Sequence, residues 1–253
     1  MKITVLVENT SRRDDIVARH GLSLYIEARG RRILFDMGQD ELFYENALRL
    51  GIDLSAVDIA IISHGHYDHG GGLAKFIEIN DTAPIYIHKA AFLPYYNGNR
   101  YIGLNPALRE SERITLVGGD ISIGGGLYLV GLDTPPTAPT HLGRMVDGRI
   151  IPDAFDHEMY LMIEDEKRVL VSGCSHKGIE AIAEHFRPDV LIGGLHLMDM
   201  PADDRLAALG RRLDASGCEY YTCHCTGYTQ YEFLTKYIKR ISYLSSGDEI
   251  AID

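Results

Sequence analysis

The sequence has no tryptophan, only four cysteines, and no apolar run near the length of about 18 residues that a membrane-spanning helix requires. Its first residues, MKITVLVENTSRRDD, contain a short apolar run but no small-residue cleavage pattern of a secretory signal. Four cysteines in 253 residues are too few for a disulfide scaffold, so we expect reduced thiols. We therefore expect a cytoplasmic protein that has no membrane partner.

Basic residues are also scarce: the sequence has 25 lysines and arginines and 36 acidic residues, which gives a net charge of −11. This balance disfavours the broad positive surface that a nucleic-acid backbone requires, so we expect no nucleic-acid partner. The length allows one large or two small domains. No linker or low-complexity segment is evident, and we expect a single domain over residues 1–253.

Short apolar runs of strand length recur along the chain, bounded by Gly, Asp, Pro or Asn. They are ITVLV, LSLYIEA, RILFD, DIAIIS, PIYIH, LYLVG, EMYLMIE, RVLVSG, DVLIGG and EYYTC. Helical spacing occupies residues 40–50, 73–79, 179–186, 203–215 and 228–238. Two segments have the pattern of a hairpin, LSLYIEA-RGRR-ILFD and LMIEDEKRVLVSG. The pattern predicts a mixed α and β protein in which helices cover two sheets.

Residues 89–114 are the least regular part of the sequence, where FLPYYNGNRYIGLNP combines aromatic residues with Pro, Gly and Asn. Two interpretations are open: a lid over a site, or a packed surface loop inserted in the domain. Its tyrosines also have two interpretations. Tyr95, Tyr96 and Tyr101 either stack on a planar substrate such as a pterin or aryl ring, or pack within the protein.

The segment IISHGHYDHGGGL crowds His64, His66, Asp68 and His69 into one loop directly after a predicted buried strand. Imidazole and carboxylate groups are good ligands for zinc and similar divalent ions, and they converge only if the backbone curls around a common centre. The glycines at 70–72 permit that tight path and a close backbone approach. A lone histidine is usually a surface polar group, but this compound pattern predicts a metal site.

The motif resembles the His-x-His-x-Asp-His signature of the metallo-β-lactamase-fold superfamily. Further segments follow, in order, the pattern of one branch, described as similar to 7,8-dihydropterin-6-ylmethyl-4-(β-D-ribofuranosyl)aminobenzene 5'-phosphate synthase. They are GLSLYIEARGRRILFDMG, LGIDLSAVDIAIISHGHYDHGGGL, LVSGCSHKGIEAI, IGGLHL and CHCTG. The resemblance spans nearly the whole chain. It implies an α+β fold of the αββα four-layer sandwich type, with the site along one edge of the two sheets.

Four ligands from one loop rarely suffice for two metal ions, and three later strand ends offer more. RVLVSGCSHKG places Cys174 and His176 after a predicted strand, DVLIGGLHL places His196 after another, and EYYTCHCTG places His224 after a third. By the resemblance, one metal is held by two motif histidines and a later one, and the other by the motif Asp-His pair and a histidine from the last strand end. This implies two ligand sets: His64, His66 and His176, and Asp68, His69 and His224.

The sequence departs from the superfamily pattern at two places, DTPPTAPTH and SGC. Cys174 stands where most members carry an aspartate that bridges the two metals. A thiolate there is able to bind or bridge a metal, but a buried inert thiol is the other interpretation. His141 is the reserve candidate for the third ligand of the first metal.

Further residues near the motifs have structural or functional interpretations. His196 is either a hydrogen-bonded histidine at a strand end or, by the resemblance, a general acid or anion-stabilising group beside the metals. Asp36 in LFDMG is expected to orient a ligand histidine or cap a turn rather than to bind metal. Cys223 and Cys225 flank His224 and, by alternation along the chain, are expected to point away from it and pack.

The leading functional hypothesis is a metal-dependent hydrolase or a closely related transferase. Two divalent ions, zinc first and manganese or iron as alternatives, would activate a hydroxide for attack on a phosphate ester or similar small molecule. Asp68 would orient that nucleophile and His196 would act at the leaving group. The branch resemblance adds a phosphorylated pterin-like or aryl substrate.

Two rival hypotheses stay open. One is a metal-binding module without turnover that uses thiols near the site as redox-responsive ligands, and the other is a mononuclear metal enzyme. An open coordination position distinguishes a catalytic site from a closed structural one. The sequence leaves the oligomeric state open.

Overall fold

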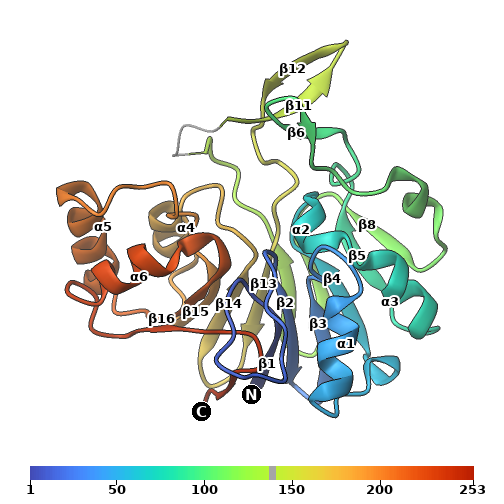
Figure 1. Ribbon diagram of the computed structural model, residues 1–253, viewed down its shortest axis with the longest axis horizontal. Coiled ribbons are helices and arrows are strands. Elements are labelled where there is room, and N and C mark those ends of the chain that lie inside the picture. The colour runs from blue at the N-terminus through green and yellow to red at the C-terminus, as the bar shows by residue number, and fades with distance from the viewer. Residues whose placement is uncertain (137–140) are drawn as a thin grey trace.

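Two seven-stranded sheets lie face to face, and helices cover the outer face of each (Figure 1). This architecture comes from a computed structural model, which describes residues 1–136 and 141–253. The order of layers is helix, sheet, sheet, helix. The fold is therefore the α+β, αββα four-layer sandwich that the sequence predicts.

The first sheet has the strand order β18-β1-β2-β3-β4-β5-β8. Its strands are β1 (Lys2–Val7), β2 (Ser23–Ala28), β3 (Arg31–Phe35), β4 (Ile59–Ile62), β5 (Ile85–His88), β8 (Ile114–Val117) and β18 (Glu249–Ala251). Its outer face packs against α1 (Leu42–Arg49), α3 (Leu73–Ile79) and the 3₁₀ turn η1 (Leu54–Ala56).

The second sheet has the strand order β17-β16-β15-β14-β13-β10-β9. Its strands are β9 (Ile121–Gly124), β10 (Leu127–Val130), β13 (Tyr160–Glu164), β14 (Arg168–Ser172), β15 (Val190–Gly194), β16 (Glu219–Cys223) and β17 (Ile241–Tyr243). Its outer face packs against α4 (Ile179–Phe186), α5 (Asp204–Ala215) and α6 (Tyr228–Leu234).

Strand alternation explains why the strands consist almost wholly of apolar residues. Ile33 and Phe35 of β3 point into the core between the sheets, whereas Leu34 packs on the helical side. In β14, Val169 and Val171 likewise face the central core, and Leu170 faces α4 and α5. Because side chains alternate with period two and both faces of each sheet are covered, neither face tolerates a polar stripe.

Both predicted hairpins are confirmed, since β2 pairs with β3 and β13 pairs with β14 in antiparallel register. Two helices, 73–79 and 179–186, have the predicted bounds. The helix expected at 40–50 begins at Leu42, because the Asp40 carboxylate accepts the Leu42 backbone N–H before the first turn. The helix expected at 228–238 ends at Leu234.

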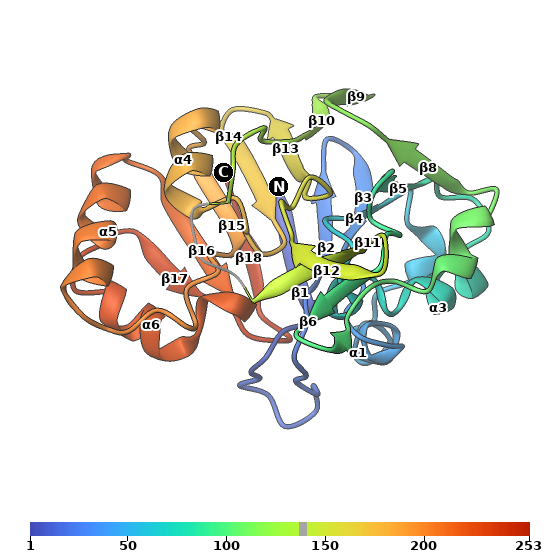
Figure 2. The ribbon, with the colours of Figure 1, turned by 90° about the horizontal axis from the view of Figure 1, so that it is seen from above.

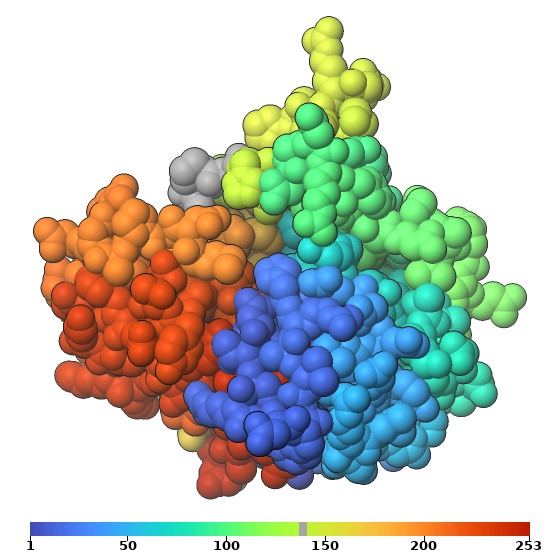
Figure 3. All heavy atoms as spheres, in the orientation of Figure 1, coloured from blue at the N-terminus to red at the C-terminus, as the bar shows by residue number. Residues whose placement is uncertain are grey.

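A third, four-stranded sheet was not predicted. It joins β6 (Tyr95–Asn97) and β7 (Arg100–Tyr101) to the hairpin of β11 (Leu142–Val146) and β12 (Arg149–Pro152), in the order β12-β11-β6-β7. The 3₁₀ turn η2 (Pro106–Glu110) follows. The hairpin projects from the body of the molecule in Figures 1 and 3 and crosses above the main sheets in Figure 2.

The carboxyl ends of two parallel runs of strands define one edge of the molecule. Strands β3, β4, β5 and β8 are parallel, as are β14, β15, β16 and β17. Parallel strands end on the same side of their sheet, and loops at that side are the usual place for ligands in such folds. The short helix α2 (Tyr67–Gly70) and the 3₁₀ turn η3 (His224–Thr226) lie at these ends.

None of the described helices has the length and apolar character needed to cross a bilayer. All four cysteines are buried and free of disulfide bonds, as the sequence predicts.

Candidate metal centre

The candidate ligands converge because each follows a strand that ends at the same edge. His64 comes two residues after β4, and Cys174 two residues after β14. His196 follows β15 at the same spacing, and His224 follows β16 directly. Neighbouring parallel strands thus bring residues that are far apart in the sequence to one place.

Three histidines, His64, His66 and His176, form a compact buried group. Their ligand-capable nitrogens lie within 4.8 Å of one another, and the ring centroids of His64 lie 4.5 Å from His66 and 4.9 Å from His176. Nε2 of His64, Nε2 of His66 and both ring nitrogens of His176 have no hydrogen-bond partner among the described residues. Buried polar atoms seldom stay unpaired, and nitrogen ligands of this kind bind zinc and related ions. The donor set therefore fits a metal ion.

The environment keeps these three imidazoles neutral, which is the form that binds metal. Burial and the neighbouring histidines lower the pKa of His64 and of His176 well below the usual value. Burial, then His157, lowers the pKa of His66 to about 3. The chain itself therefore leaves the lone pairs of the group available near neutral pH.

A second group gathers around Asp68. Its Oδ2 atom lies 3.5 Å from Nε2 of His224, 3.9 Å from Nε2 of His69, and 3.1 Å from Nε2 of His20. Nε2 of His69 and Nε2 of His224 are 3.2 Å apart. The structure thus brings together the predicted set Asp68, His69 and His224, and it adds His20, which sequence reasoning missed.

His69 is oriented by Asp36, as the sequence predicts. Nδ1 of His69 lies 2.7 Å from Oδ2 of Asp36, and Ser63 donates to the same carboxylate from its backbone N–H and its hydroxyl. Burial lowers the pKa of His69, but Asp36 and Asp68 outweigh it and raise the pKa to about 9. The contact directs Nε2 of His69 toward the cluster.

Cys174 lies inside the cluster, with Sγ 3.2 Å from Nε2 of His69. Burial raises the pKa of its thiol well above the usual value. The expectation that Cys225 points away from the site is wrong, because its sulfur groups with Cys174 and His224 within 4.8 Å. The chain turns from β16 into η3 at this point, so strand alternation no longer applies. Cys223, in contrast, packs in the central core as expected.

His196 faces the first group, with its ring centroid 4.2 Å from that of His176. Its Nδ1 atom is buried and has no hydrogen-bond partner among the described residues. A ring nitrogen of His196 also lies within 4.8 Å of the sulfur of Cys174 and of a ring nitrogen of His176. The residue is therefore positioned beside the cluster rather than turned away at a strand end.

Backbone strain concentrates around this centre. Asp36, Ser175, His196 and His224 all adopt positive φ angles between 50° and 62°, although none is glycine. Such conformations cost free energy and persist where the surrounding structure fixes them, which is common at functional sites. In each case the strain turns the chain sharply at a strand end.

The backbone of the His-rich segment, residues 64–72, also packs closely against neighbouring segments of the chain. A Cβ atom on Gly65 would lie 2.2 Å from the carbonyl oxygen of Ala91, and one on Gly71 would lie 2.0 Å from that of Gln39. Only glycine fits at these positions, which explains part of the glycine content of the motif.

Several supporting residues carry no sequence signal that would reveal them. Nδ1 of His157 accepts the backbone N–H of Gly65 at 2.8 Å, and its Nε2 lies 3.0 Å from Asp153. Glu158 accepts the backbone N–H of His176 at 2.7 Å. His157 and Asp153 belong to no predicted strand or motif, and Glu158 only begins the predicted strand EMYLMIE, so only the folded chain places these residues at the site.

The remaining predicted candidates lie elsewhere or pack. His141 is exposed, so it does not belong to the buried histidine group; the preceding residues 137–140 of DTPPTAPTH lie outside the described residues. Tyr95 is buried, its hydroxyl donates to the carbonyl of Ala90, and its ring centroid lies 4.0 Å from that of His157. Tyr96 and Tyr101 contact each other edge to face. The packing interpretation therefore holds for Tyr95.

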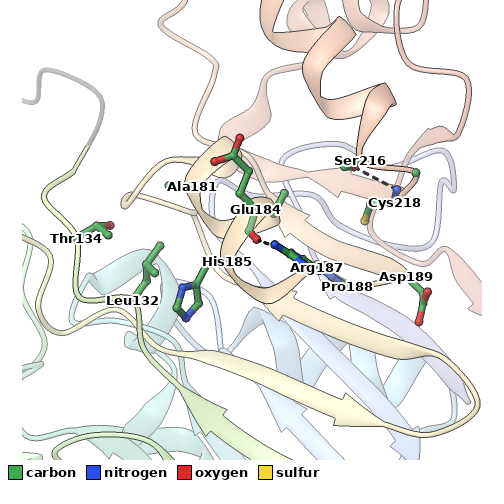
Figure 4. A pocket seen from close by; sticks show the side chains of 12 residues that line it. Leu132, Thr134, Ala181, Glu184, His185, Arg187, Pro188, Asp189, Ser216 and Cys218 are labelled. Carbon is green, nitrogen blue, oxygen red and sulfur yellow. Dashed lines mark hydrogen bonds between the residues drawn. The ribbon is translucent and has the colours of Figure 1, made fainter.

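A separate hollow of about 820 Å³ lies beside α4 (Figure 4). Leu132, Arg187, Ser216 and Cys218 are among its lining residues, and none of the clustered histidines is. It is therefore not the access route to the metal centre.

Comparison with known proteins identifies the family. The model of the metallo-β-lactamase superfamily matches residues 16–173. The chain belongs to the metallo-β-lactamase superfamily. An uncharacterized protein of Methanocaldococcus jannaschii is 32% identical over 89% of this chain and 91% of the relative.

Two further relatives have named activities. The 7,8-dihydropterin-6-methyl-4-(β-D-ribofuranosyl)-aminobenzene-5'-phosphate synthase of Methanocaldococcus jannaschii is 30% identical over 83% of this chain and 82% of the relative. A solved metal-dependent hydrolase of the β-lactamase superfamily is 29% identical, with a TM-score of 0.85 over 100% of this chain and 99% of that one. At the family level, these likenesses support a metal-dependent enzyme.

Proposed function

We propose that the chain is a metal-dependent hydrolase, or a closely related transferase, that acts on a small phosphorylated molecule. The observation that carries the proposal is the buried group of His64, His66 and His176 with unpartnered nitrogens, set beside Asp68 and His224. The side chain of Asp68 is 12% exposed, so solvent reaches the edge of the cluster at this residue. A buried ligand set with one open side suits catalysis better than a closed structural site.

Two divalent ions fit the two groups of side chains, zinc first and manganese or iron as alternatives. The proposed ligands are His64, His66 and His176 for one position and Asp68, His69 and His224 for the other, with Cys174 as a further donor. Bound there, such ions supply a hydroxide near neutral pH and polarise the oxygen of the substrate.

Two side chains have proposed roles in the reaction beyond binding. The exposed side of the Asp68 carboxylate accepts a hydrogen bond from the attacking water and orients it. His196, whose ring centroid lies 4.2 Å from that of His176 and whose Nδ1 has no partner among the described residues, holds a proton for the leaving oxygen. Asp36 positions His69 and does not contact the substrate.

The substrate class rests on the synthase relative, whose name describes a phosphate-bearing compound. This supports a phosphate ester as the ligand, and a pterin or aryl group as its second part. A hydrolase relative of similar identity supports water as the attacking group. Phosphate esters are therefore the first compounds to test.

We further propose that residues 89–114 form part of a lid within a single domain. His66 forms an isolated bridge with Gly103, and the backbone N–H of Tyr67 donates to the carbonyl of Ile102 at 2.8 Å. The segment is thus attached to the ligand loop itself, where a displacement would change access to the centre.

The proposal is tested by screening phosphomonoesters and phosphodiesters with purified protein and then comparing variants. We expect His66→Ala and Asp68→Ala to lose metal and activity together, with activity falling at least about 100-fold. His141→Ala is the matched control, because this exposed histidine lies outside the group. Full activity in the double variant His66→Ala with Asp68→Ala would refute the proposal.

A second candidate function is a redox-responsive metal-binding module, which the 3.2 Å contact between Cys174 Sγ and His69 Nε2 favours. In this case peroxide treatment releases metal from the wild type but not from Cys174→Ser. Cys218→Ser is the control, since Cys218 is buried away from the cluster. Release that is unchanged both in Cys174→Ser and in Cys225→Ser, the other thiol of the cluster, would exclude this function.

A further inference from the structure

His20 reaches the metal centre from a part of the chain that carries no ligand motif. It lies in the loop between β1 and β2, more than forty positions before the His-rich segment. Its Nε2 atom is 3.1 Å from Oδ2 of Asp68, and its ring centroid is 4.8 Å from that of His224. Ligand-capable atoms of His20, Asp68 and His224 all lie within 4.8 Å of one another.

The loop that carries His20 is fixed on both sides of the residue. Gln39 donates its side-chain amide to the carbonyl oxygen of His20 at 2.5 Å. The backbone N–H of Leu22 donates to the carbonyl of Asp68 at 3.1 Å. Between them, Gly21 has a φ of +137°, and a Cβ there would lie 2.6 Å from that same carbonyl oxygen. Because Gly21 has no Cβ, its backbone packs closely against that of Asp68, and this contact holds the neighbouring His20 beside the segment that carries the metal ligands.

Asn9 connects this loop to His224. Its Oδ1 atom accepts the backbone N–H of Gly21 at 3.2 Å and lies 3.0 Å from Nδ1 of His224. An amide oxygen accepts only, so Nδ1 of His224 carries the proton and Nε2 presents its lone pair toward Asp68. The same asparagine thus sets the ligand form of His224 and the position of the His20 loop.

The separations around Asp68 match those of a four-coordinate ion. Ligand atoms arranged tetrahedrally at about 2.0–2.2 Å from zinc lie about 3.3–3.6 Å from one another. The observed separations are 3.1 Å for His20 to Asp68, 3.5 Å for His224 to Asp68, and 3.2 Å for His69 to His224. The separation of His69 Nε2 from Asp68 Oδ2 is 3.9 Å, so these two ligand atoms must move closer together before all four side chains share one ion.

We infer that His20 is the fourth protein ligand of the metal position formed by Asp68, His69 and His224. The inference rests on the proposed metal centre and makes its two positions unequal. Three histidines hold the first position and four side chains hold the second, while Cys174, whose sulfur groups with both His64 and His69, is the further donor near both positions. The second ion is then the firmly held one, and substrate exchange takes place at the first.

The alternative is that His20 only donates a hydrogen bond to Asp68 and positions it. Removing such a supporting partner lowers metal affinity by about 10- to 100-fold, and a side chain that restores the hydrogen bond restores affinity. Removing a ligand costs more, and a hydrogen-bond donor alone does not replace it. The two roles therefore predict different losses of metal affinity, and only the positioning role predicts that a hydrogen-bonding side chain restores that affinity.

The test is titration of metal-free protein with Zn²⁺ in competition with a chromophoric chelator, which gives the number of ions bound and each affinity. We expect two ions for the wild type. In His20→Ala and in His20→Gln alike, we expect one of the two affinities to fall more than about 100-fold while the other stays unchanged. His141→Ala is the matched control and should bind both ions as the wild type does.

The outcomes separate this inference from the proposed function. Two unchanged affinities in His20→Ala, or recovery in His20→Gln, would overturn the ligand role of His20 and leave the two-metal centre in place. A wild type that binds one ion or none would overturn both. Retention of the unaffected affinity in His20→Ala shows that the variant is folded at the centre.

Discussion

Asp36 and His69 are joined by a 2.7 Å contact between carboxylate and imidazole, and both side chains are completely buried. Asp36 directly follows β3, whereas His69 lies in α2, after β4. The carboxylate also accepts two hydrogen bonds from Ser63. One residue outside the motif thus fixes both the start of the ligand loop and the direction of a ligand within it.

Replacement of Asp36 should therefore reduce both stability and metal binding. Asp36→Ala leaves buried donors of Ser63 and His69 without a partner, which costs about 1–3 kcal/mol of unfolding free energy for each. We expect metal affinity to fall about 10- to 100-fold, as for other outer partners of ligand histidines. Urea unfolding and chelator competition measure the two effects. Glu166→Ala, an exposed acidic residue on the β13–β14 turn, is the control, and an equal effect of both variants would contradict this role.

A substitution at Gly65 tests whether close backbone packing positions the metal ligands His64 and His66. In Gly65→Ala the added Cβ meets the Ala91 carbonyl at 2.2 Å, so one of the two segments must move. Overpacking of this kind costs about 1–3 kcal/mol of stability, and the shift displaces the flanking ligands His64 and His66. We expect weaker metal binding and a lower melting temperature by calorimetry. Gly119→Ala, where a Cβ meets nothing within 4 Å, should leave both unchanged.

His88 should make stability depend on pH. Burial, then His157 and Lys89, lowers its pKa to about 4, and its Nδ1 accepts the backbone N–H of Ala90. The folded state thus favours the neutral ring, while the unfolded chain takes up a proton below about pH 6.5. This contribution to stability is complete above about pH 6.5 and is lost as the pH falls toward 4.

Urea unfolding of metal-free wild type and His88→Gln at several values between pH 7.5 and 4 measures the effect without metal release. We expect the wild type to lose more stability than His88→Gln over this interval, because glutamine accepts the same hydrogen bond without titrating. Parallel curves for the two proteins would show that His88 does not contribute.

Local patterns predict the strands and place the candidate histidines at strand ends, whereas the order of layers and the grouping of the ligands follow from the resemblance to the superfamily. Apolar runs of strand length indicate the strands, and histidines placed just after such runs are candidates to meet where neighbouring parallel strands end. His64, His66 and His176 come together in this way.

The residues that escaped prediction depend on tertiary contacts instead. His20 lies in a loop with no periodicity, and His157 acts through the backbone of Gly65. Cys225 was assigned to packing because strand alternation was extended two residues past the end of β16, into η3. The third sheet pairs two segments with weak strand patterns that only the folded chain brings side by side.

Element-resolved mass spectrometry of protein purified without chelator measures whether this chain holds the two divalent ions proposed for the cluster. We expect close to two ions of zinc, manganese or iron per chain in the wild type. We expect close to none in a variant that combines His66→Ala with Asp68→Ala, and wild-type content in His141→Ala. Wild-type protein without bound metal, or full content in the double variant, would show that the cluster is not a two-metal centre.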